Sequence, residues 1–358
     1  MQIVHVPLAE RSYDIYINDN FKNLAGTALN PYKNYKIMVV VDSNVDMFFS
    51  KKCINEIEKA GAIPFKFVFF AGEENKNLET VNEIYKACLK NKFERGDAIL
   101  ALGGGVTGDI AGFVAATYMR GINFIQVPTS VLAQCDSSIG GKVGVDFEGV
   151  KNIIGCFYQP KSVYINTSAL KTLPEREYFS GFGEIVKHAI IKDEILFEYL
   201  ENNIEALCAR DTAILSAVVE RNCKIKAEVV SIDEKEAGIR EMLNFGHTIG
   251  HAVESESDFL MLHGECVSIG MVGISNIAVR IGLLSVNDFD RIIKLLQKLK
   301  LPVIYKGLDP EEIYSLMQLD KKVKKGRINY VVPVRIGEVR ITSDIDENII
   351  KEALHDIL

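Results

Sequence analysis

Three short segments in the second half of the chain hold side chains that could bind a divalent metal. Glu184 lies in GEIVKH, His247 and His251 lie in NFGHTIGH, and His263 lies in LHGE. The chain has only six histidines, so three of them within Gly246–His263 is an unusual concentration. His247 and His251 are four residues apart and would share one face of a helix. Two histidines and a carboxylate with one position left open form a catalytic zinc arrangement, so the pattern predicts a metal site; helix-packing or capping histidines are the alternative.

The histidine pair does not indicate a metalloprotease. In an HExxH helix, the glutamate that follows the first histidine is the general base for peptide hydrolysis. Thr248 occupies that position here, so peptide hydrolysis would lack its base.

A glycine-rich turn in the first half of the chain is typical of nucleotide binding. The turn reads GGGVTGD between a strand-like and a helix-like segment, and Gly103, Gly105 and Gly108 satisfy GxGxxG. Glycine lets the backbone turn sharply beside a pyrophosphate, whose charge the helix N-terminus favours. The usual acidic ribose partner, about 20 positions onward, is missing, because the next acidic residue after the turn is Asp136. The motif favours nucleotide binding over a merely tight turn.

Other polar residues also follow strand-like segments. Asp42 and Asn44 come after the apolar run Met38–Val41, where the strand ends of open α/β sheets line a ligand crevice. Glu73 and Lys76 in AGEENK could contact the ribose and adenine edges of a nucleotide. A solvated loop or a helix cap is the alternative for this second pair.

The segment Gln126–Lys142 (QVPTSVLAQCDSSIGGK) suits an anion site, and Lys151 and Asn152 follow in GVKNIIG. Backbone N–H groups and ammonium ions can both reach a phosphate. Asp136 could orient a hydroxyl or the carboxamide of a nicotinamide. The alternative is a glycine-rich loop with solvated lysines.

The elements that must position these residues change character along the chain. Short apolar strands are expected at Tyr35–Val41, Pro64–Phe70, Ala98–Leu102 and Phe124–Val127, with helices at Val45–Ala60 and Leu78–Asn91. This alternation is typical of a parallel sheet covered on both faces. Long amphipathic segments then dominate, such as Thr212–Val230 and Asp288–Lys300, until the strand-like Ile328–Val334. We therefore predict an α/β domain over residues 1–168 and a mainly helical domain over residues 169–358.

The composition and charge of the chain disfavour several other classes of protein. The chain has 358 residues, 48% of them hydrophobic and 25% charged, as expected for a globular protein of two domains. A net charge of -7 without basic runs disfavours nucleic acid as a partner, and no apolar run reaches the ~20 residues of a membrane span. The N-terminus alternates like a strand and has no features of a signal peptide. Seven scattered cysteines without a CxxC pair are typical of a reducing cytoplasm, where we expect the protein to be located.

Six motifs together resemble the 3-dehydroquinate synthase family of sugar phosphate cyclases. They are GGGVTGDIAGFVAATYMRG, QVPTSVLAQCDSSIGGK, KNIIGCFYQP, GEIVKHAI, LNFGHTIGHAVE and LHGECVSIGM, and the resemblance runs in register from about Val40 to the Asp320–Lys322 segment. It implies a Rossmann-like N-terminal domain, a helical C-terminal domain and a homodimer. It also implies a divalent metal, zinc or cobalt, and an NAD that is regenerated in every turnover.

The resemblance assigns roles residue by residue. Metal ligands would be Glu184, His247 and His263. Nucleotide-binding positions would be Asp42, Asn44, Glu73, Lys76, Gly105, Val106, Thr107, Gly108, Asp109, Thr129, Ser130, Asp136, Lys142, Lys151, Leu170, Lys171 and Thr172. Substrate-binding or catalytic positions would be Lys142, Lys151, Asn152, Lys187, Lys226, Arg240, Asn244 and His251. Arg120 would cross a dimer interface to the phosphate in the partner's site.

One residue departs from the family pattern, and one segment cannot be assigned from it. Ser130 stands where the pattern usually has a second threonine, and it retains the hydroxyl. The segment Asp320–Arg327 (DKKVKKGR) varies among members, so the basic residue that meets the phosphate stays unassigned.

The implied substrate is an anionic sugar-acid phosphate, 3-deoxy-D-arabino-heptulosonate 7-phosphate, and the implied product is 3-dehydroquinate. The implied reaction oxidises the carbon-5 hydroxyl, eliminates phosphate, returns the hydride and closes a carbocycle by an aldol step. Amino-dehydroquinate synthase remains an alternative, because its substrate is almost isosteric. Arg240 and Asn244 argue against 2-deoxy-scyllo-inosose synthase, whose substrate has no carboxylate. A metal-dependent polyol dehydrogenase would have no need for so many lysines, and a nucleotide-sensing module would leave the metal residues unexplained.

Overall fold

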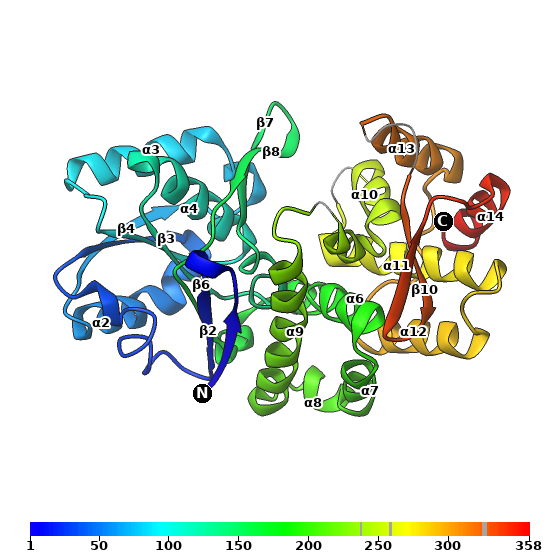
Figure 1. The fold of residues 1–358 in the computed structure, drawn as a ribbon, viewed down its shortest axis with the longest axis horizontal. Coiled ribbons are helices and arrows are strands. Elements are labelled where there is room, and N and C mark those ends of the chain that lie inside the picture. Colours follow the sequence, from blue (N-terminus) through cyan, green and yellow to red (C-terminus); the bar gives the residue numbers. More distant parts are fainter. Residues whose placement is uncertain (237, 258–259, 324–327) are drawn as a thin grey trace. The chain divides into compact units, whose positions relative to one another are not determined.

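A computed structural model of the chain describes residues 1–236, 238–257, 260–323 and 328–358, with the backbone alone for residues 319–323. The chain forms two compact units (Figure 1). The first unit comprises Met1–Leu173 and Thr212–Lys235, and the second comprises Pro174–Asp211 and Glu236–Leu358.

A seven-stranded sheet forms the centre of the first unit. Its strands run in the order β1 (Gln2–Val6), β2 (Tyr13–Asn18), β9 (Ser162–Asn166), β6 (Asn123–Pro128), β5 (Ala98–Gly103), β3 (Lys36–Asp42) and β4 (Ile63–Phe69). All neighbouring strands are parallel except β1 and β2. The four strands expected between Tyr35 and Val127 are confirmed.

Helices cover both faces of this sheet. Ile37, Val39 and Val41 of β3 pack in one apolar cluster with residues of α2 (Lys51–Lys59). The alternate residues Met38 and Val40 pack in a second cluster with α3 (Leu78–Lys90) and α4 (Gly105–Thr117), and Figure 1 shows these helices on opposite sides of the strands. Burial on both faces explains why the strands are continuous apolar runs.

The second unit is mainly helical, as predicted. Its helices are α5 (Glu175–Ser180), α6 (Phe182–Lys192), α7 (Glu194–Asn202), α8 (Ile204–Cys208), α10 (His247–Glu256), α11 (His263–Arg280), α12 (Val286–Lys298), α13 (Pro310–Val323) and α14 (Glu347–Ile357). Helix α11 packs against α6, α10, α12 and α14. A short antiparallel hairpin of β10 (Tyr330–Arg335) and β11 (Glu338–Thr342) completes the unit.

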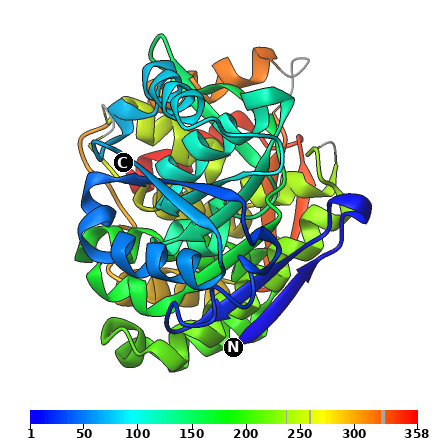
Figure 2. The same ribbon diagram turned by 90° about the vertical axis from the view of Figure 1, so that its left-hand side faces the viewer.

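The two units differ from the contiguous domains 1–168 and 169–358 that the sequence suggests. Helix α9 (Thr212–Ile232) belongs to the first unit, because it packs against β1 and β2. Figure 2 shows the blue β1–β2 hairpin beside this green helix. The amphipathic pattern of α9 identifies a helix but does not identify the surface that it covers.

A second hairpin in the first unit begins where the segment Gln126–Lys142 ends, and it carries Lys142, Lys151 and Asn152. It consists of β7 (Lys142–Phe147) and β8 (Val150–Phe157), visible as the projecting pair of strands in Figure 1. Gly144 and Gly155 face each other across it, and a β-carbon on Gly144 would lie 2.7 Å from the Ile154 carbonyl oxygen.

Helix α1 (Ser43–Val45) follows β3 and continues through the π-helical turn Asp46–Ser50 into α2. No helix within the described ranges is long and apolar enough to cross a membrane.

Candidate functional site

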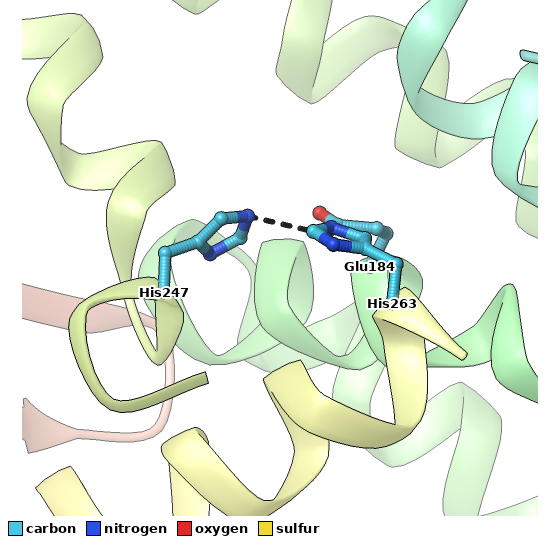
Figure 3. A group of neighbouring side chains, drawn as sticks. All are labelled: Glu184, His247 and His263. Atoms are coloured by element: carbon cyan, nitrogen blue, oxygen red, sulfur yellow. Dashed lines mark hydrogen bonds and ion pairs between the residues drawn. The ribbon is translucent and has the colours of Figure 1, made fainter. Parts of the chain in front are cut away.

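The three candidate metal ligands each lie in the first turn of a different helix of the second unit. Glu184 is in the first turn of α6, and His247 and His263 are the first residues of α10 and α11. Figure 3 shows the three side chains pointing toward one another. Folding therefore brings three separate sequence segments to one point.

Glycines at two helix crossings allow this approach. A β-carbon on Gly264 would overlap the carbonyl oxygen of Ser180, and one on Gly183 would lie 2.6 Å from the Gly264 carbonyl oxygen. A β-carbon on Gly270 would overlap the carbonyl oxygen of Gly246. Gly183, Gly246 and Gly264 are each adjacent in sequence to a candidate ligand. The close helix packing therefore positions the ligands directly.

The hydrogen bonds of His247 point to a cation at this site. Its Nε2 lies 3.4 Å from Glu184 Oε1, and its Nδ1 lies 3.1 Å from the carbonyl oxygen of Phe245. A carbonyl oxygen can only accept, so we assign the proton to Nδ1. Nε2 then presents a lone pair to the carboxylate of Glu184. Two facing acceptors need a proton or a metal ion between them.

His263 has a carboxylate on each side of its ring. Its Nε2 lies 3.2 Å from Glu184 Oε1, and its Nδ1 lies 3.3 Å from Glu254 Oε2. Burial disfavours the charged ring, but the hydrogen bonds to Glu184 and Glu254 raise the pKa of His263 to about 10. This ring therefore also favours a positive charge beside Glu184.

Glu184 is the negative centre of the group. Its side chain is 1% exposed and forms an ion pair with the buried Lys187 one helical turn later. Burial would raise the pKa of this carboxyl, but the Lys187 ammonium and His247 hold it well below its ordinary range. Burial and the charge of Lys187 lower the pKa of His247, which keeps the ring neutral and able to bind a metal.

The residues present fit a tetrahedral divalent metal. With bonds of ~2.0–2.1 Å, two ligand atoms of a tetrahedral zinc site lie about 3.3–3.4 Å apart. The two measured separations from Glu184 Oε1, 3.2 and 3.4 Å, agree with that spacing. A carboxylate and two imidazoles also suit zinc or cobalt. A second possible group, His251, Glu254 and His263, shares one of these histidines.

The other candidate residues of the second unit lie in the segment just before α10 or on α10 itself. Arg240, which is 2% exposed, and Asn244 lie on a short 3-10 helix, Ile239–Asn244, just before α10. Asn244 Nδ2 donates to Glu236 Oε1 at 3.3 Å. His251 is exposed on α10, with its ring centroid 5.2 Å from that of His247. The side chains of Asp320–Arg327 lie outside the described residues.

In the first unit, the glycine motif has the strand-turn-helix context that we predicted. Helix α4 begins at Gly105, so the residues of the motif from Gly105 to Asp109 form its first turn. A β-carbon on Gly103 would overlap the Thr107 side chain, and one on Gly105 would lie 3.4 Å from Ser137 Oγ. The turn leaves no room for a larger residue at Gly103, whereas a β-carbon at Gly105 would make an ordinary contact with Ser137.

Asp42 ties the end of β3 to this turn. Its Oδ1 accepts from the backbone N–H groups of Asn44 and Val45, which caps α1, and its Oδ2 accepts from Thr107 Oγ1 at 3.1 Å. Thr129 N also donates to the carbonyl oxygen of Gly103 at 2.9 Å. The ends of β3, β5 and β6 thus meet at one edge of the sheet.

The buried Lys76 is the centre of a polar cluster on the same unit. Its Nζ lies 2.7 Å from Asp109 Oδ2 and donates to Asn152 Oδ1 at 2.5 Å, and Glu73 Oε1 lies 3.6 Å away. Burial raises the pKa of Asp109 to about 6 despite the opposing charge of Lys76. Asn152 has a left-handed backbone with φ of 54° and donates its N–H to Asp146.

The partly exposed Asp136 forms an ion pair with the buried Lys226. Lys226 Nζ, on α9, donates to Asp136 Oδ1 at 2.6 Å and to the Asp136 carbonyl oxygen at 2.5 Å. Ser130 follows β6, and its Oγ accepts from Ala133 N. Leu170, Lys171 and Thr172 end the 3-10 helix Thr167–Thr172.

Three cations of the first unit lie at its surface. Lys142 and Lys151 are exposed on the β7–β8 hairpin. Arg120 is also exposed and has a left-handed backbone with φ of 66°, between Met119 (φ 52°) and Gly121 (φ 114°). Backbone strain of this kind concentrates at functional segments.

Three polar residues that contact candidate site residues were not predicted from the sequence. Glu254 contacts His263, Glu236 contacts Asn244, and Asp146 contacts Asn152. Only Glu254 had a detectable signal, because it lies seven residues after His247 and would share its helical face.

Comparisons with known proteins identify relatives of the whole chain. The family model for the N-terminal part of 3-dehydroquinate synthase matches residues 66–180, and the model for the C-terminal part matches residues 181–323. The chain is 48% identical to the 3-dehydroquinate synthase of Acetivibrio thermocellus over 352 residues, which cover 98% of each chain.

Solved structures of sugar phosphate cyclases have the same fold. A 2-epi-5-epi-valiolone synthase from Streptomyces hygroscopicus, with NAD⁺ and Zn²⁺ bound, matches with a TM-score of 0.89, 28% identity and 96% of each chain covered. A 2-deoxy-scyllo-inosose synthase complexed with carbaglucose-6-phosphate, NAD⁺ and Co²⁺ matches with a TM-score of 0.89, 25% identity and full coverage of both chains.

The helix crossing beside the ligands yields a first prediction. Gly264→Ala should weaken zinc binding at least ~10-fold and lower the free energy of unfolding by about 1–3 kcal/mol, because the new methyl group forces α11 away from Ser180. Zinc titration and thermal unfolding measure the two effects. Gly26→Ala is the control, since its β-carbon would meet no atom within 4 Å. Equal zinc affinity in both variants would show that this crossing does not position the ligands.

Proposed function

This chain belongs to the 3-dehydroquinate synthase family, and from that membership we infer that it converts 3-deoxy-D-arabino-heptulosonate 7-phosphate to 3-dehydroquinate and phosphate. This is a carbon–oxygen lyase reaction of the shikimate pathway, which leads to chorismate and the aromatic amino acids. The observation that carries the assignment is the convergence of Glu184, His247 and His263 within a chain that resembles such enzymes along almost its whole length.

We propose that Glu184, His247 and His263 hold a divalent metal, zinc or cobalt, and that the first unit binds NAD⁺. Two related cyclases contain these groups. When bound, NAD⁺ supplies a reversible hydride acceptor, and the metal supplies a Lewis acid that polarises substrate hydroxyls. The chain's own residues provide binding, orientation and electrostatic stabilisation.

The edge of the sheet where β3, β5 and β6 end would bind the nucleotide. Asp42, Asn44 and the turn Gly105–Asp109 lie at these strand ends, where ligands of open α/β sheets bind. The N–H groups at the start of α4 have no partner within their own helix and favour a pyrophosphate. Glu73, Lys76, Thr129, Ser130, Asp136 and Leu170–Thr172 would complete the contacts, and Lys142 and Lys151 would contribute from the hairpin.

Cationic and amide side chains would bind the two anionic groups of the substrate. Lys142, Asn152 and His251 would bind the phosphate, while Lys187, Arg240 and Asn244 would bind the carboxylate end and the ring hydroxyls. Lys226 would act beside Asp136, with which it is already paired. The buried position of Lys187 strengthens its field on any nearby negative charge, because water screens it little.

We also propose that the protein is a homodimer and that Arg120 reaches the phosphate in the partner's site. The exposed side chain and strained backbone of Arg120 suit a residue held for a contact outside its own fold. Its planar fork can bind a phosphate through two parallel hydrogen bonds. A cytoplasmic location accords with the free state of all seven cysteines.

Phosphate release without net NADH tests the proposed reaction. With the heptulosonate phosphate, zinc and NAD⁺ at a small fraction of the substrate, we expect many phosphates released per NAD⁺. NADH should not accumulate, because each hydride returns within the same turnover. Stoichiometric NADH would instead identify a dehydrogenase. Phosphate release from a substrate without the carboxylate, at the same kcat/KM, would identify another cyclase.

The glycine turn yields a prediction for NAD binding alone. Gly105→Val should abolish NAD⁺ binding in a calorimetric titration, because the added side chain would crowd the pyrophosphate position and Ser137. Zinc content should remain that of the unmodified protein. Normal NAD⁺ affinity in this variant would place the nucleotide elsewhere.

Subunit mixing tests the role of Arg120. Arg120→Ala should cost about 2–5 kcal/mol of substrate binding if the contact is buried at an interface. When inactive Arg120→Ala and Glu184→Ala homodimers exchange subunits, half the dimers become mixed and each gains one intact site, so about a quarter of full activity should return.

The matched control mixes Lys187→Ala with Glu184→Ala. Lys187 and Glu184 form an ion pair within one chain, so each mixed dimer keeps a defect in both sites and no activity should return. If the Arg120 mixture also stays inactive after proven exchange, Arg120 acts within its own subunit.

A further inference from the structure

We propose that Glu254 is a positioning residue that orients His263 for metal binding; this inference rests on the proposed metal centre at Glu184, His247 and His263. Glu254 Oε2 lies 3.3 Å from Nδ1 of His263, the ring nitrogen that faces away from Glu184. The Glu254 side chain is 12% exposed and the His263 side chain 31% exposed. A partly buried carboxylate therefore fixes the more exposed of the two candidate histidines.

One face of α10 carries both a candidate metal ligand and the carboxylate that contacts His263. His247 is the first residue of α10, and Glu254 follows seven residues later, two helical turns along the same face. The first turn of the helix thus supplies one ligand, and its second turn supplies the partner of another. Gly250, between them, packs closely against α11, since its β-carbon would lie 3.0 Å from the Cys266 carbonyl oxygen. This contact brings Glu254 to the beginning of α11.

The two histidines are oriented by different acceptors. The Nδ1 of His247 is bonded to the backbone carbonyl of Phe245, which follows from the local chain path. The Nδ1 of His263 is bonded to a side-chain carboxylate from another helix. A carboxylate that accepts from one imidazole nitrogen fixes the ring and makes the other nitrogen a stronger ligand. His263 therefore depends on a residue that substitution can remove.

The two nitrogens of His263 distinguish a positioning role for Glu254 from a role as a metal ligand. The Nε2 atoms of His247 and His263 both face Glu184 Oε1, so a metal there binds His263 through Nε2. Glu254 contacts Nδ1, on the other side of the ring. His263 is also part of a second possible ligand group, with His251 and Glu254. The proposal therefore excludes His251 and Glu254 from the ligand set.

The test compares zinc affinity in Glu254→Ala, Glu254→Gln and His251→Ala by competition with a chelator of known affinity. Glu254→Ala should bind one zinc per chain, but 10- to 100-fold more weakly, which is the range for loss of a partner of a metal ligand. Glu254→Gln should retain most of the affinity, because its amide oxygen still accepts the Nδ1 proton. His251→Ala should keep its zinc affinity within about threefold. Glu312→Ala, which removes an exposed carboxylate of α13, is the matched control.

Two outcomes would overturn the proposal. Unchanged zinc affinity in Glu254→Ala would show that His263 needs no carboxylate partner. Loss of zinc stoichiometry in both Glu254→Ala and His251→Ala, with zinc retained in Glu184→Ala, would identify the alternative ligand group. These measurements use zinc alone, so failure of the unmodified protein to release phosphate would contradict the proposed function and leave this test intact.

Discussion

The arrangement of the candidate site in the second unit depends on how the charge of the buried Glu184 carboxylate is compensated. A charged group that is 1% exposed is costly unless cationic or donor groups surround it. Lys187, His247 and His263 meet that need from three helices, and glycines let those helices approach closely enough. A metal ion would supply the positive charge that the facing acceptors require. Packing and electrostatics thus favour the same arrangement.

In the first unit, the corresponding constraint is the edge where parallel strands end. Asp42 caps the turn after β3 and also accepts from Thr107 at the start of α4. Lys76 joins α4 to the β7–β8 hairpin through Asp109 and Asn152. These bonds hold several candidate nucleotide and substrate residues in one network. A side-chain change in that network would therefore affect more than one contact.

Local patterns in the sequence predicted much of this architecture. Apolar runs such as Met38–Val41 identified the central strands because those strands are buried on both faces. The rare histidines and Glu184 indicated a candidate set of metal ligands, and the fold brings these three side chains together. Family resemblance supplied the remaining roles, which spacing alone left open.

Long-range packing explains what the sequence did not predict. Helix α9 lies against β1 and β2, more than 190 residues earlier in the chain, and no local pattern encodes that contact. The β7–β8 hairpin, whose strands pair across Gly144 and Gly155, was not predicted from the sequence. Glu254 resembles any surface carboxylate of a helix until His263 is placed beside it.

X-ray diffraction from zinc-loaded crystals, with anomalous data collected at the zinc edge, tests the central claim most directly. The account predicts one zinc per chain, bound to Nε2 of His247 and His263 and to a Glu184 oxygen at ~2.0–2.2 Å. His251 should be beyond bonding distance, and Glu254 should contact only Nδ1 of His263. A zinc ion bound to His251 or Glu254, or one that leaves Glu184 uncoordinated, would contradict the account.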